Sequence, residues 1–262
     1  MHGSRGTLGC LVLLGLSLAA CGGSDGSADS DSTTAASADA SAETAAPPGS
    51  SGDPSSTPGP SCTAVTVVLA AEPVTLDPGD NGVVVVPVQR NILQTLVSPD
   101  PETGELVPEL ATSWEQIEPT TWRFTLRDGV SFSNGEPFDA EAVVQTIERI
   151  LDPEKNLPTS QFLTPMTASA PDARTVDVST EEPNPILPNE MFFVPISAPV
   201  ATGDSASVRE PIGTGPYVLD SWESGNSIVL ELNETYWGER PSVEQMTFVW
   251  RAEPSVRASM VK

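Results

Sequence analysis

The sequence predicts a mixed α/β domain, of the α+β kind, over residues 63–262. Segments with the two-residue alternation of half-buried strands outnumber segments with helical spacing. The two kinds occur in mixed order and without an internal repeat. A stretch of about 200 residues is also long enough to form one hydrophobic core.

The first elements of the domain are a strand and a helix. Residues 63–69, TAVTVVL, form a β-branched run that predicts a buried strand, which Pro73 and Pro78 stop. Pro87 suits the first turn of a helix. The apolar spacing that follows predicts a buried helix face made of Val88, Ile92, Leu93 and Leu96.

Strand signals continue through the middle of the domain. Residues 109–116 and 120–130 both indicate strands, and in the second Trp122, Phe124 and Leu126 alternate with polar residues. The Asp128-Gly129 dipeptide is a hairpin turn signal, so residues 130–133 are predicted as a short return strand. Asn134-Gly135 predicts a second turn.

The segment FSNGEPFDAEAVV (132–144) concentrates acidic side chains, yet the pattern predicts scaffold and not a reactive site. Asp139 is the expected N-cap of a helix over 137–153, and Glu141 lies in its first turn, where the helix dipole favours negative charge. Pro153 ends the helix. The predicted buried face is Val143, Ile147, Ile150 and Leu151.

Downstream, four more segments have the strand pattern: 174–180, 215–223, 226–237 and 243–252. Residues 184–193 indicate a short helix broken by proline, in which Phe192 and Phe193 are expected to be core residues.

Residues 1–20 have the pattern of a secretory signal peptide. Arg5 precedes an apolar run of about a dozen residues, which is shorter than the roughly 20 needed to span a bilayer. The run ends in LSLAAC, which resembles the lipobox of bacterial lipoproteins, so Cys21 is the expected site of lipidation. The alternative is ordinary cleavage near Ala20, which leaves Cys21 as a thiol.

Residues 21–62 are predicted to be a disordered linker rich in Ser, Ala, Gly, Asp and Pro. Between Gly22 and Ser61 there is no aromatic, Leu, Ile, Val, Met, Lys or Arg residue, so there is nothing to offset the entropy of ordering. Cys62 is left without a partner in the domain and is either a thiol or paired outside this sequence.

Charge and composition exclude several functional classes. Cleavage after residue 20 would remove Arg5 but no acidic residue, which moves the formal charge from −24 to −25. Such an acidic chain is not expected to bind nucleic acid. His2, the single histidine, would also be lost, which excludes Ser-His-Asp and Cys-His catalysis and leaves no zinc ligand set. The GTGP loop (213–216) lacks the Lys-Ser/Thr of a phosphate-binding loop. We therefore expect no enzyme, no catalytic residue, no metal site and no cofactor.

Five motifs carry a resemblance to one family. They are TLDP (75–78), LVPELATSWE (106–115), WRFTLRDGVSFSNGEPFDAEAVV (122–144), PIGTGPYVL (211–219) and NETYWGERPSVEQMTF (233–248). Together and in this order they resemble the extracytoplasmic solute-binding proteins of ABC importers, in the oligopeptide, dipeptide and nickel class known as family 5.

The resemblance implies a type II periplasmic-binding-protein-like clamshell, of which this sequence would supply the first lobe, incomplete, since it stops at Lys262 in the apparent start of a helix. It also implies a monomeric, lipid-anchored extracytoplasmic protein that captures a peptide-like small solute for an ABC permease and ATPase complex. The alternatives are a surface lipoprotein with an adhesion or signalling role and a binder of nickel or a metal chelate.

The loop after TLDP lines the solute cleft in this family. Its ligand-binding candidates here are Asp80, Asn81 and Gly82, through a carboxylate and backbone groups. The alternative is an ordinary polar turn before a helix.

Overall fold

The structure is a computed structural model, and it describes residues 63–199 and 209–260. The predicted signal peptide (1–20), the lipidation site Cys21, the linker (21–62) and Cys62 lie outside the described residues. Within the described ranges, no helix has both the length and the apolar character that crossing a membrane requires.

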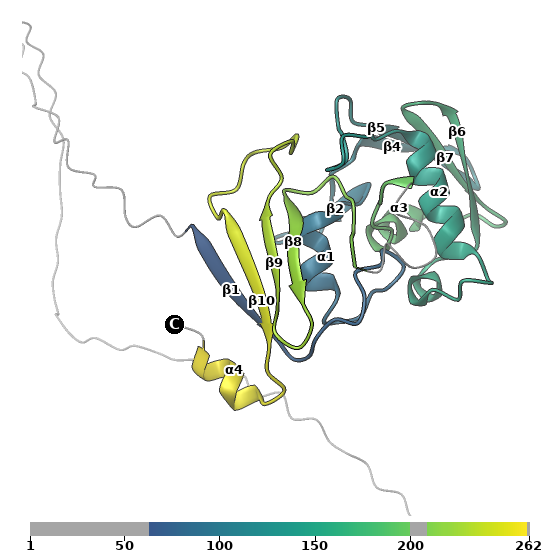
Figure 1. Cartoon of the computed structure of the whole chain (residues 1–262). Coiled ribbons are helices and arrows are strands. Elements are labelled where there is room, and N and C mark those ends of the chain that lie inside the picture. Colours follow the sequence, from purple (N-terminus) through teal and green to yellow (C-terminus); the bar gives the residue numbers. More distant parts are fainter. Residues whose placement is uncertain (1–62, 200–208, 261–262) are drawn as a thin grey trace, which may run out of the picture. The chain divides into compact units, whose positions relative to one another are not determined.

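One four-stranded sheet joins the beginning and the end of the domain. Its strand order is β1 (Ala64–Leu69), β10 (Gln245–Trp250), β9 (Ser227–Leu232) and β8 (Tyr217–Glu223). β1 pairs with β10 in parallel, and the other pairs are antiparallel. Helix α1 (Val86–Ile92) packs against this sheet at β8 (Figure 1).

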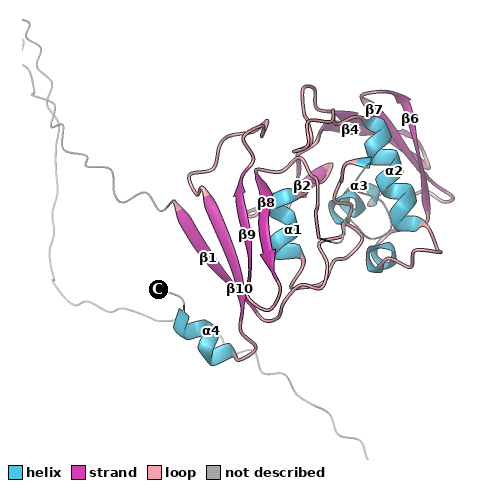
Figure 2. Cartoon of the chain, viewed as in Figure 1, coloured by secondary structure: helices cyan, strands magenta, loops and turns pink. Residues whose placement is uncertain are grey.

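A second four-stranded sheet is antiparallel throughout and built from the middle of the chain. Its order is β4 (Ala111–Glu118), β5 (Thr121–Leu126), β7 (Thr175–Thr180) and β6 (Met166–Asp172). Helix α2 (Ala140–Leu151) packs across β6 and β7 (Figure 2). The two sheets and their helices confirm the predicted mixed α/β class.

Short elements connect these layers. β2 (Val97–Pro99) pairs with β3 (Leu106–Pro108), and η1 (Pro158–Phe162) is a 3₁₀ helix. Helix α3 (Leu187–Glu190) continues directly into the 3₁₀ helix η2 (Met191–Phe193). The helix predicted over 184–193 is therefore present.

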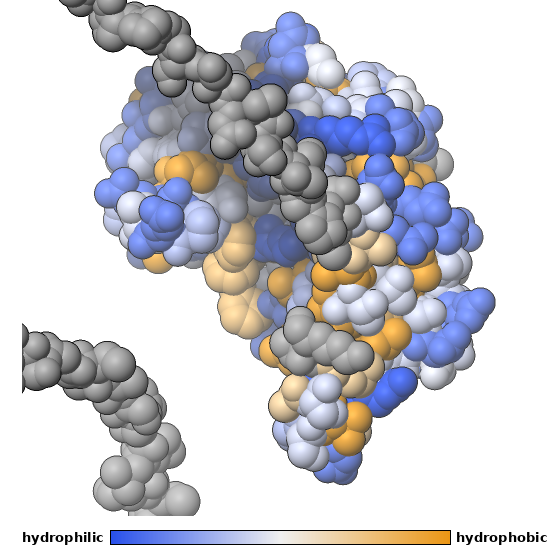
Figure 3. Space-filling view, turned by 90° about the vertical axis from the view of Figure 1, so that its left-hand side faces the viewer, coloured by the Kyte–Doolittle hydropathy of each residue, from blue (hydrophilic) through white to orange (hydrophobic). Residues whose placement is uncertain are grey.

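Strand β1 is present but is not the buried strand that the sequence predicts. Only Leu69 in it is buried, because β1 is the edge of its sheet. Helix α4 (Pro254–Met260), which agrees with the helical start expected near the end of the sequence, contacts β1 but buries none of its own residues. Figure 3 views the molecule from the side on which β1 and α4 lie in Figure 1, and hydrophobic residues are interspersed there with hydrophilic ones.

The buried apolar side chains form two clusters, one for each sheet. Leu76, Ile92, Leu93, Ile228, Leu230 and Phe248 belong to the first, and Leu96, Phe124, Leu126, Phe132, Val143, Ile147, Ile150, Val176 and Val178 belong to the second. Phe124 and Leu126 are buried as their alternation predicts. Helix α1 ends at Ile92, so Leu93 and Leu96 are buried from the segment that follows it.

The return strand predicted over 130–133 is wrong. Ser131 and Pro137 form only an isolated bridge, because β4 and β7 already occupy both edges of β5. The turns around this segment are present, and Gly129 and Gly135 both adopt positive φ angles.

The start of α2 agrees with the sequence. The Asp139 side chain accepts a hydrogen bond of 3.1 Å from the Ala142 N–H, and Glu141 lies in the first turn. Val143, Ile147 and Ile150 form the buried face. Asp139 and Glu141, two of the acidic residues in the 132–144 segment, therefore stabilise the N-terminus of α2.

Asp139→Ala is expected to lower the free energy of unfolding by about 1 kcal/mol, because the Ala142 N–H loses its acceptor at the helix start. Urea denaturation of the full chain measures this change. Glu148→Ala is the matched control, since it removes an exposed carboxylate from the same helix without touching its cap. Equal effects of the two substitutions would contradict the capping role.

The GTGP loop makes a close backbone contact with the end of α1. The Gly215 N–H donates to the Ile92 carbonyl at 2.8 Å, and the Gly213 carbonyl accepts from the Ser133 N–H at 2.9 Å. A Cβ atom on Gly213 would lie 2.1 Å from the Ile92 oxygen. Gly213 and Gly215 are thus required by the close approach of the two backbone segments.

Candidate functional site

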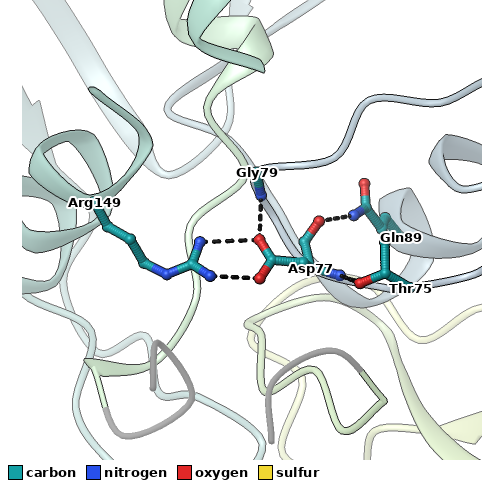
Figure 4. A network of polar contacts seen from close by, with 5 residues as sticks. All are labelled: Thr75, Asp77, Gly79, Gln89 and Arg149. Carbon is teal, nitrogen blue, oxygen red and sulfur yellow. Dashed lines mark hydrogen bonds and ion pairs between the residues drawn. The ribbon is translucent and has the colours of Figure 1, made fainter. Parts of the chain in front are cut away.

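The TLDP motif is the centre of a polar network (Figure 4). The Asp77 carboxylate receives two hydrogen bonds from the Arg149 guanidinium, of which the Nη1–Oδ1 contact is 2.9 Å long. It also accepts the Gly79 N–H at 2.7 Å, while the Asp77 N–H donates to Thr75 Oγ1 at 2.9 Å. The Asp77 carbonyl accepts a hydrogen bond from the Gln89 side chain.

The ion pair between Asp77 and Arg149 is nearly buried, with side-chain exposures of 10% and 9%. Arg149 lies on α2, which packs on the antiparallel sheet, whereas Asp77 lies between β1 and α1. The pair therefore joins the segment after β1 to the helix of the other sheet, and it anchors the loop that follows TLDP.

Asp80, Asn81 and Gly82 form the polar turn that the alternative interpretation expects. The Asp80 N–H donates to the Asp77 carbonyl at 2.9 Å, and Asp80 Oδ1 accepts the Gly82 N–H at 2.8 Å. The Gly82 carbonyl then accepts the N–H groups of Val85 and Val86, at the start of α1.

Two hollows open beside this turn. The first, of about 580 Å³, is mainly polar and has Asp77, Asp80, Arg149, Asp152 and Lys155 among its lining residues. The second, of about 170 Å³, is lined by Asp80, Asn81 and mainly apolar side chains. The structure thus places Asp80 on both hollows and Asn81 on the second, and it does not bring Gly82 to the lining of either.

The second hollow, which we call the aromatic hollow, contains three phenylalanines. Phe162 of η1 stacks on Phe193 with ring centroids 5.5 Å apart, and Phe192 meets Phe193 edge to face, also at 5.5 Å. Phe162 is 53% and Phe193 is 36% exposed. The prediction that Phe192 and Phe193 are core residues is therefore wrong, because η2 turns them toward this hollow. Phe162 was not singled out by sequence.

Arg90 closes one side of the aromatic hollow. Its guanidinium lies 4.0 Å from the centre of the Phe192 ring and donates to the Phe192 carbonyl. Burial lowers the pKa of Arg90 from its ordinary value, and the negative charge of Glu109 opposes this shift. Through these two contacts with Phe192, the Arg90 guanidinium helps to hold η2 in place.

Glu109, from the LVPELATSWE motif, holds the segment after α1. Its carboxylate accepts the Thr95 N–H at 2.9 Å, the Thr95 hydroxyl at 2.7 Å and the Gln94 side-chain amide at 3.2 Å. Its carbonyl accepts Arg127 Nε at 3.0 Å. Glu109 therefore has a structural role, because its contacts hold neighbouring segments of the chain in place.

Gln94 extends the same network to two further motifs. Its Oε1 accepts the Thr214 hydroxyl at 3.0 Å and the Trp237 indole N–H at 2.8 Å. Arg127 lies 4.4 Å from the Trp237 ring centre. Burial raises the pKa of the neighbouring Tyr236, and Glu109 acts in the same direction. Four of the sequence motifs thus meet around one glutamine and one glutamate.

The aromatic hollow presents rings beside charged groups, namely the carboxylate of Asp80 and the guanidinium of Arg90. In the part of the chain that the structure describes, no group of three or more His, Cys, Asp or Glu residues is placed to hold a metal ion. The chemistry available at the aromatic hollow is an apolar surface next to a carboxylate.

Two proteins of Escherichia coli are similar to this chain in sequence. The chain is 34% identical to the nickel-binding periplasmic protein of Escherichia coli over 163 residues, which are 59% of this chain and 31% of that protein. It is 30% identical to the probable D,D-dipeptide-binding periplasmic protein DdpA of E. coli over 203 residues, 68% of this chain and 37% of that protein. The chain spans about a third of the length of these curated relatives.

The fold matches a solved structure of the same kind. NikA from Brucella suis in complex with Fe(III)-EDTA superposes with a TM-score of 0.67 at 28% identity, covering 75% of this chain and 41% of that one. This match confirms the periplasmic-binding-protein-like fold. The model of the bacterial extracellular solute-binding proteins, family 5 (middle), matches residues 105–262. The chain therefore belongs to the family 5 bacterial extracellular solute-binding proteins.

Proposed function

We propose that the chain is the solute-binding component of an ABC importer, which captures peptides or similar small solutes outside the cytoplasm and passes them unaltered to a permease and ATPase complex. The observation that carries this proposal is the aromatic hollow beside Asp80, at the loop after TLDP, in a chain of family 5. Apolar hollows with a few placed polar groups are typical of small-molecule sites.

The proposal includes the N-terminal organisation predicted from sequence. Residues 1–20 would direct export, Cys21 would carry the lipid, and residues 21–62 would tether a monomeric solute-binding domain that begins at residue 63. Two acyl chains anchor a protein stably, since each buried CH₂ contributes about 0.8 kcal/mol.

A metal chelate is the second candidate for the solute. The relative that shares 34% identity is named as nickel-binding, and the related Brucella structure contains Fe(III)-EDTA. Since the described residues offer no cluster of metal-ligating side chains, a chelated metal suits this part of the chain better than a bare ion.

A thermal-unfolding screen of the protein expressed from its native gene tests the proposal. We expect a subset of short peptides or metal chelates to stabilise it, by about 2.7 kcal/mol when the solute is present at one hundred times its dissociation constant. Simple sugars serve as the control set. A screen in which no peptide and no chelate shifts the transition would contradict the proposed function and favour an adhesion or signalling role on the same fold.

A further inference from the structure

The sequence contains two Asn-Gly dipeptides, Asn81-Gly82 and Asn134-Gly135. In such a pair the glycine nitrogen can bond to the side-chain amide carbon of the asparagine, which forms a succinimide ring and releases the amide nitrogen as ammonia. Water then opens the ring to aspartate or isoaspartate. Glycine favours this reaction because it has no side chain to restrict the backbone. The surroundings of each dipeptide therefore decide which asparagine reacts.

Asn134-Gly135 is open to solvent. The dipeptide lies in the connection between β5 and α2, and both of its residues are exposed. A Cβ atom on Gly135 would meet nothing within 4 Å, so the space beside its backbone is empty of protein atoms. Water and hydroxide, which the reaction requires, can therefore reach this amide.

The side-chain carbonyl of Asn134 is also activated for attack. Its Oδ1 accepts the Glu136 N–H at 3.0 Å. Negative charge develops on this oxygen when the glycine nitrogen attacks, and the donor stabilises that charge, as the donors of an oxyanion hole do. The Gly135 N–H donates to the Phe132 carbonyl at 2.9 Å, which is a neutral acceptor.

Asn81-Gly82 has a different environment. Both residues are half-buried, and the Gly82 N–H donates to Asp80 Oδ1 at 2.8 Å. Hydrogen bonds to an ionised acceptor are roughly twice as strong as those between neutral groups. The Asp80 charge also opposes loss of the Gly82 amide proton, because that loss would place a second negative charge beside the first. The carboxylate thus makes the Gly82 nitrogen a poorer nucleophile.

We propose that Asn134 is a site of spontaneous deamidation and that the Asp80 carboxylate protects Asn81 from the same reaction. The inference is independent of any solute, and it gives Asp80 a role that requires no ligand. At Asn134 the side-chain –NH₂ leaves as ammonia and an oxygen from water takes its place. Where the ring opens to isoaspartate, the main chain also gains one carbon.

Deamidation of Asn134 would disturb contacts on both sides of its turn. The Phe132 N–H donates to the Glu136 carbonyl at 2.8 Å, and the Ser133 N–H donates to the Gly213 carbonyl at 2.9 Å. A longer main chain between these residues strains both hydrogen bonds, so the change extends to the GTGP loop. Protection of Asn81, in turn, keeps a second carboxylate out of the lining of the aromatic hollow.

Peptide mapping by mass spectrometry tests the proposal. The protein expressed from its native gene is incubated at mildly alkaline pH, and the conversion of both asparagines is followed in the same sample. Asn134 is expected to deamidate at least about fivefold faster than Asn81, a ratio that corresponds to the strength of one hydrogen bond. In protein unfolded with guanidinium chloride these contacts are lost, so the two rates should become similar.

Two variants test the protective role of Asp80. Asp80→Ala removes both the acceptor and the charge, and it is expected to accelerate deamidation of Asn81 about tenfold, the size of one charge-assisted hydrogen bond. Asp80→Asn keeps an acceptor for the Gly82 N–H and should give a smaller increase. Asp220→Asn, at an exposed carboxylate on β8, is the matched control and should leave Asn81 at its wild-type rate. Asn134 is the internal reference in every sample.

Each half of the proposal has its own contradicting result. Equal rates at Asn81 and Asn134 in the folded protein would overturn the assignment of the reactive site. If Asn81 reacts no faster in Asp80→Ala and in Asp80→Asn than in the wild type, the protective role is overturned. Neither result bears on the proposed importer function, because no solute enters the experiment.

Discussion

Arg149→Met is expected to lower the free energy of unfolding by about 3 kcal/mol. The substitution keeps much of the apolar volume of the side chain but removes the bidentate partner of Asp77, whose side chain is only 10% exposed. Removing one partner of a buried ion pair typically costs about 3–5 kcal/mol, because the remaining charge stays out of water. Urea denaturation of the full chain measures the change.

The pair of Arg123 and Asp177 provides the matched control. It has the same bidentate geometry, with contacts of 2.7 and 2.6 Å, but the Arg123 side chain is 38% exposed. Arg123→Met should therefore cost much less, because solvent screens the charges. In addition, Asp77→Asn combined with Arg149→Met should cost less than the sum of the single substitutions. A small effect of Arg149→Met, equal to that of Arg123→Met, would show that burial does not set the strength of the pair.

Gly213→Ala is expected to destabilise the domain by at least about 2 kcal/mol. The added methyl group would lie 2.1 Å from the Ile92 carbonyl oxygen, so either α1 or the GTGP loop must move. Such a shift also disturbs the hydrogen bond from the Gly215 N–H to Ile92. Thermal and urea unfolding of the full chain measure the loss.

Gly225→Ala separates this steric effect from a conformational one. Gly225 has a φ angle of 80°, and a Cβ atom there would meet nothing within 4 Å. Its replacement should cost about 1 kcal/mol, the price of a left-handed conformation for a residue with a side chain. If Gly213→Ala costs no more than Gly225→Ala, the close approach to Ile92 is not restrictive.

Local patterns predicted much of the secondary structure because the forces that set it are local. The Asp139 cap, the buried face of α2 and the alternation in β5 each depend on residues within one or two turns or on one strand face. The sequence did not predict β6, because this strand lacks such a local pattern. Its sequence, MTASAPD, is rich in small residues and contains Pro171, and it forms an edge strand with an irregular register before Asp172.

The candidate site was predicted less completely because it depends on contacts between distant segments. Asp80 and Asn81 were proposed from the TLDP motif and do line a hollow. The partner of Asp77 lies 72 residues away, a separation that no local pattern reports. Phe192 and Phe193 have the composition of core residues, and only the packing of η2 against Phe162 reveals that Phe193 is exposed and Phe192 half-buried.

The parallel pairing of β1 with β10 constrains the order of folding. Ala64 is paired with Gln245, so the first strand has no neighbour in its sheet until the chain has been made as far as β10. The antiparallel sheet, in contrast, is complete by residue 180. Since contacts distant in sequence form slowly, a chain that emerges N-terminus first should assemble the middle of the domain early. Its opening strand would then wait as an unpaired segment, exposed to proteases and to association with other chains.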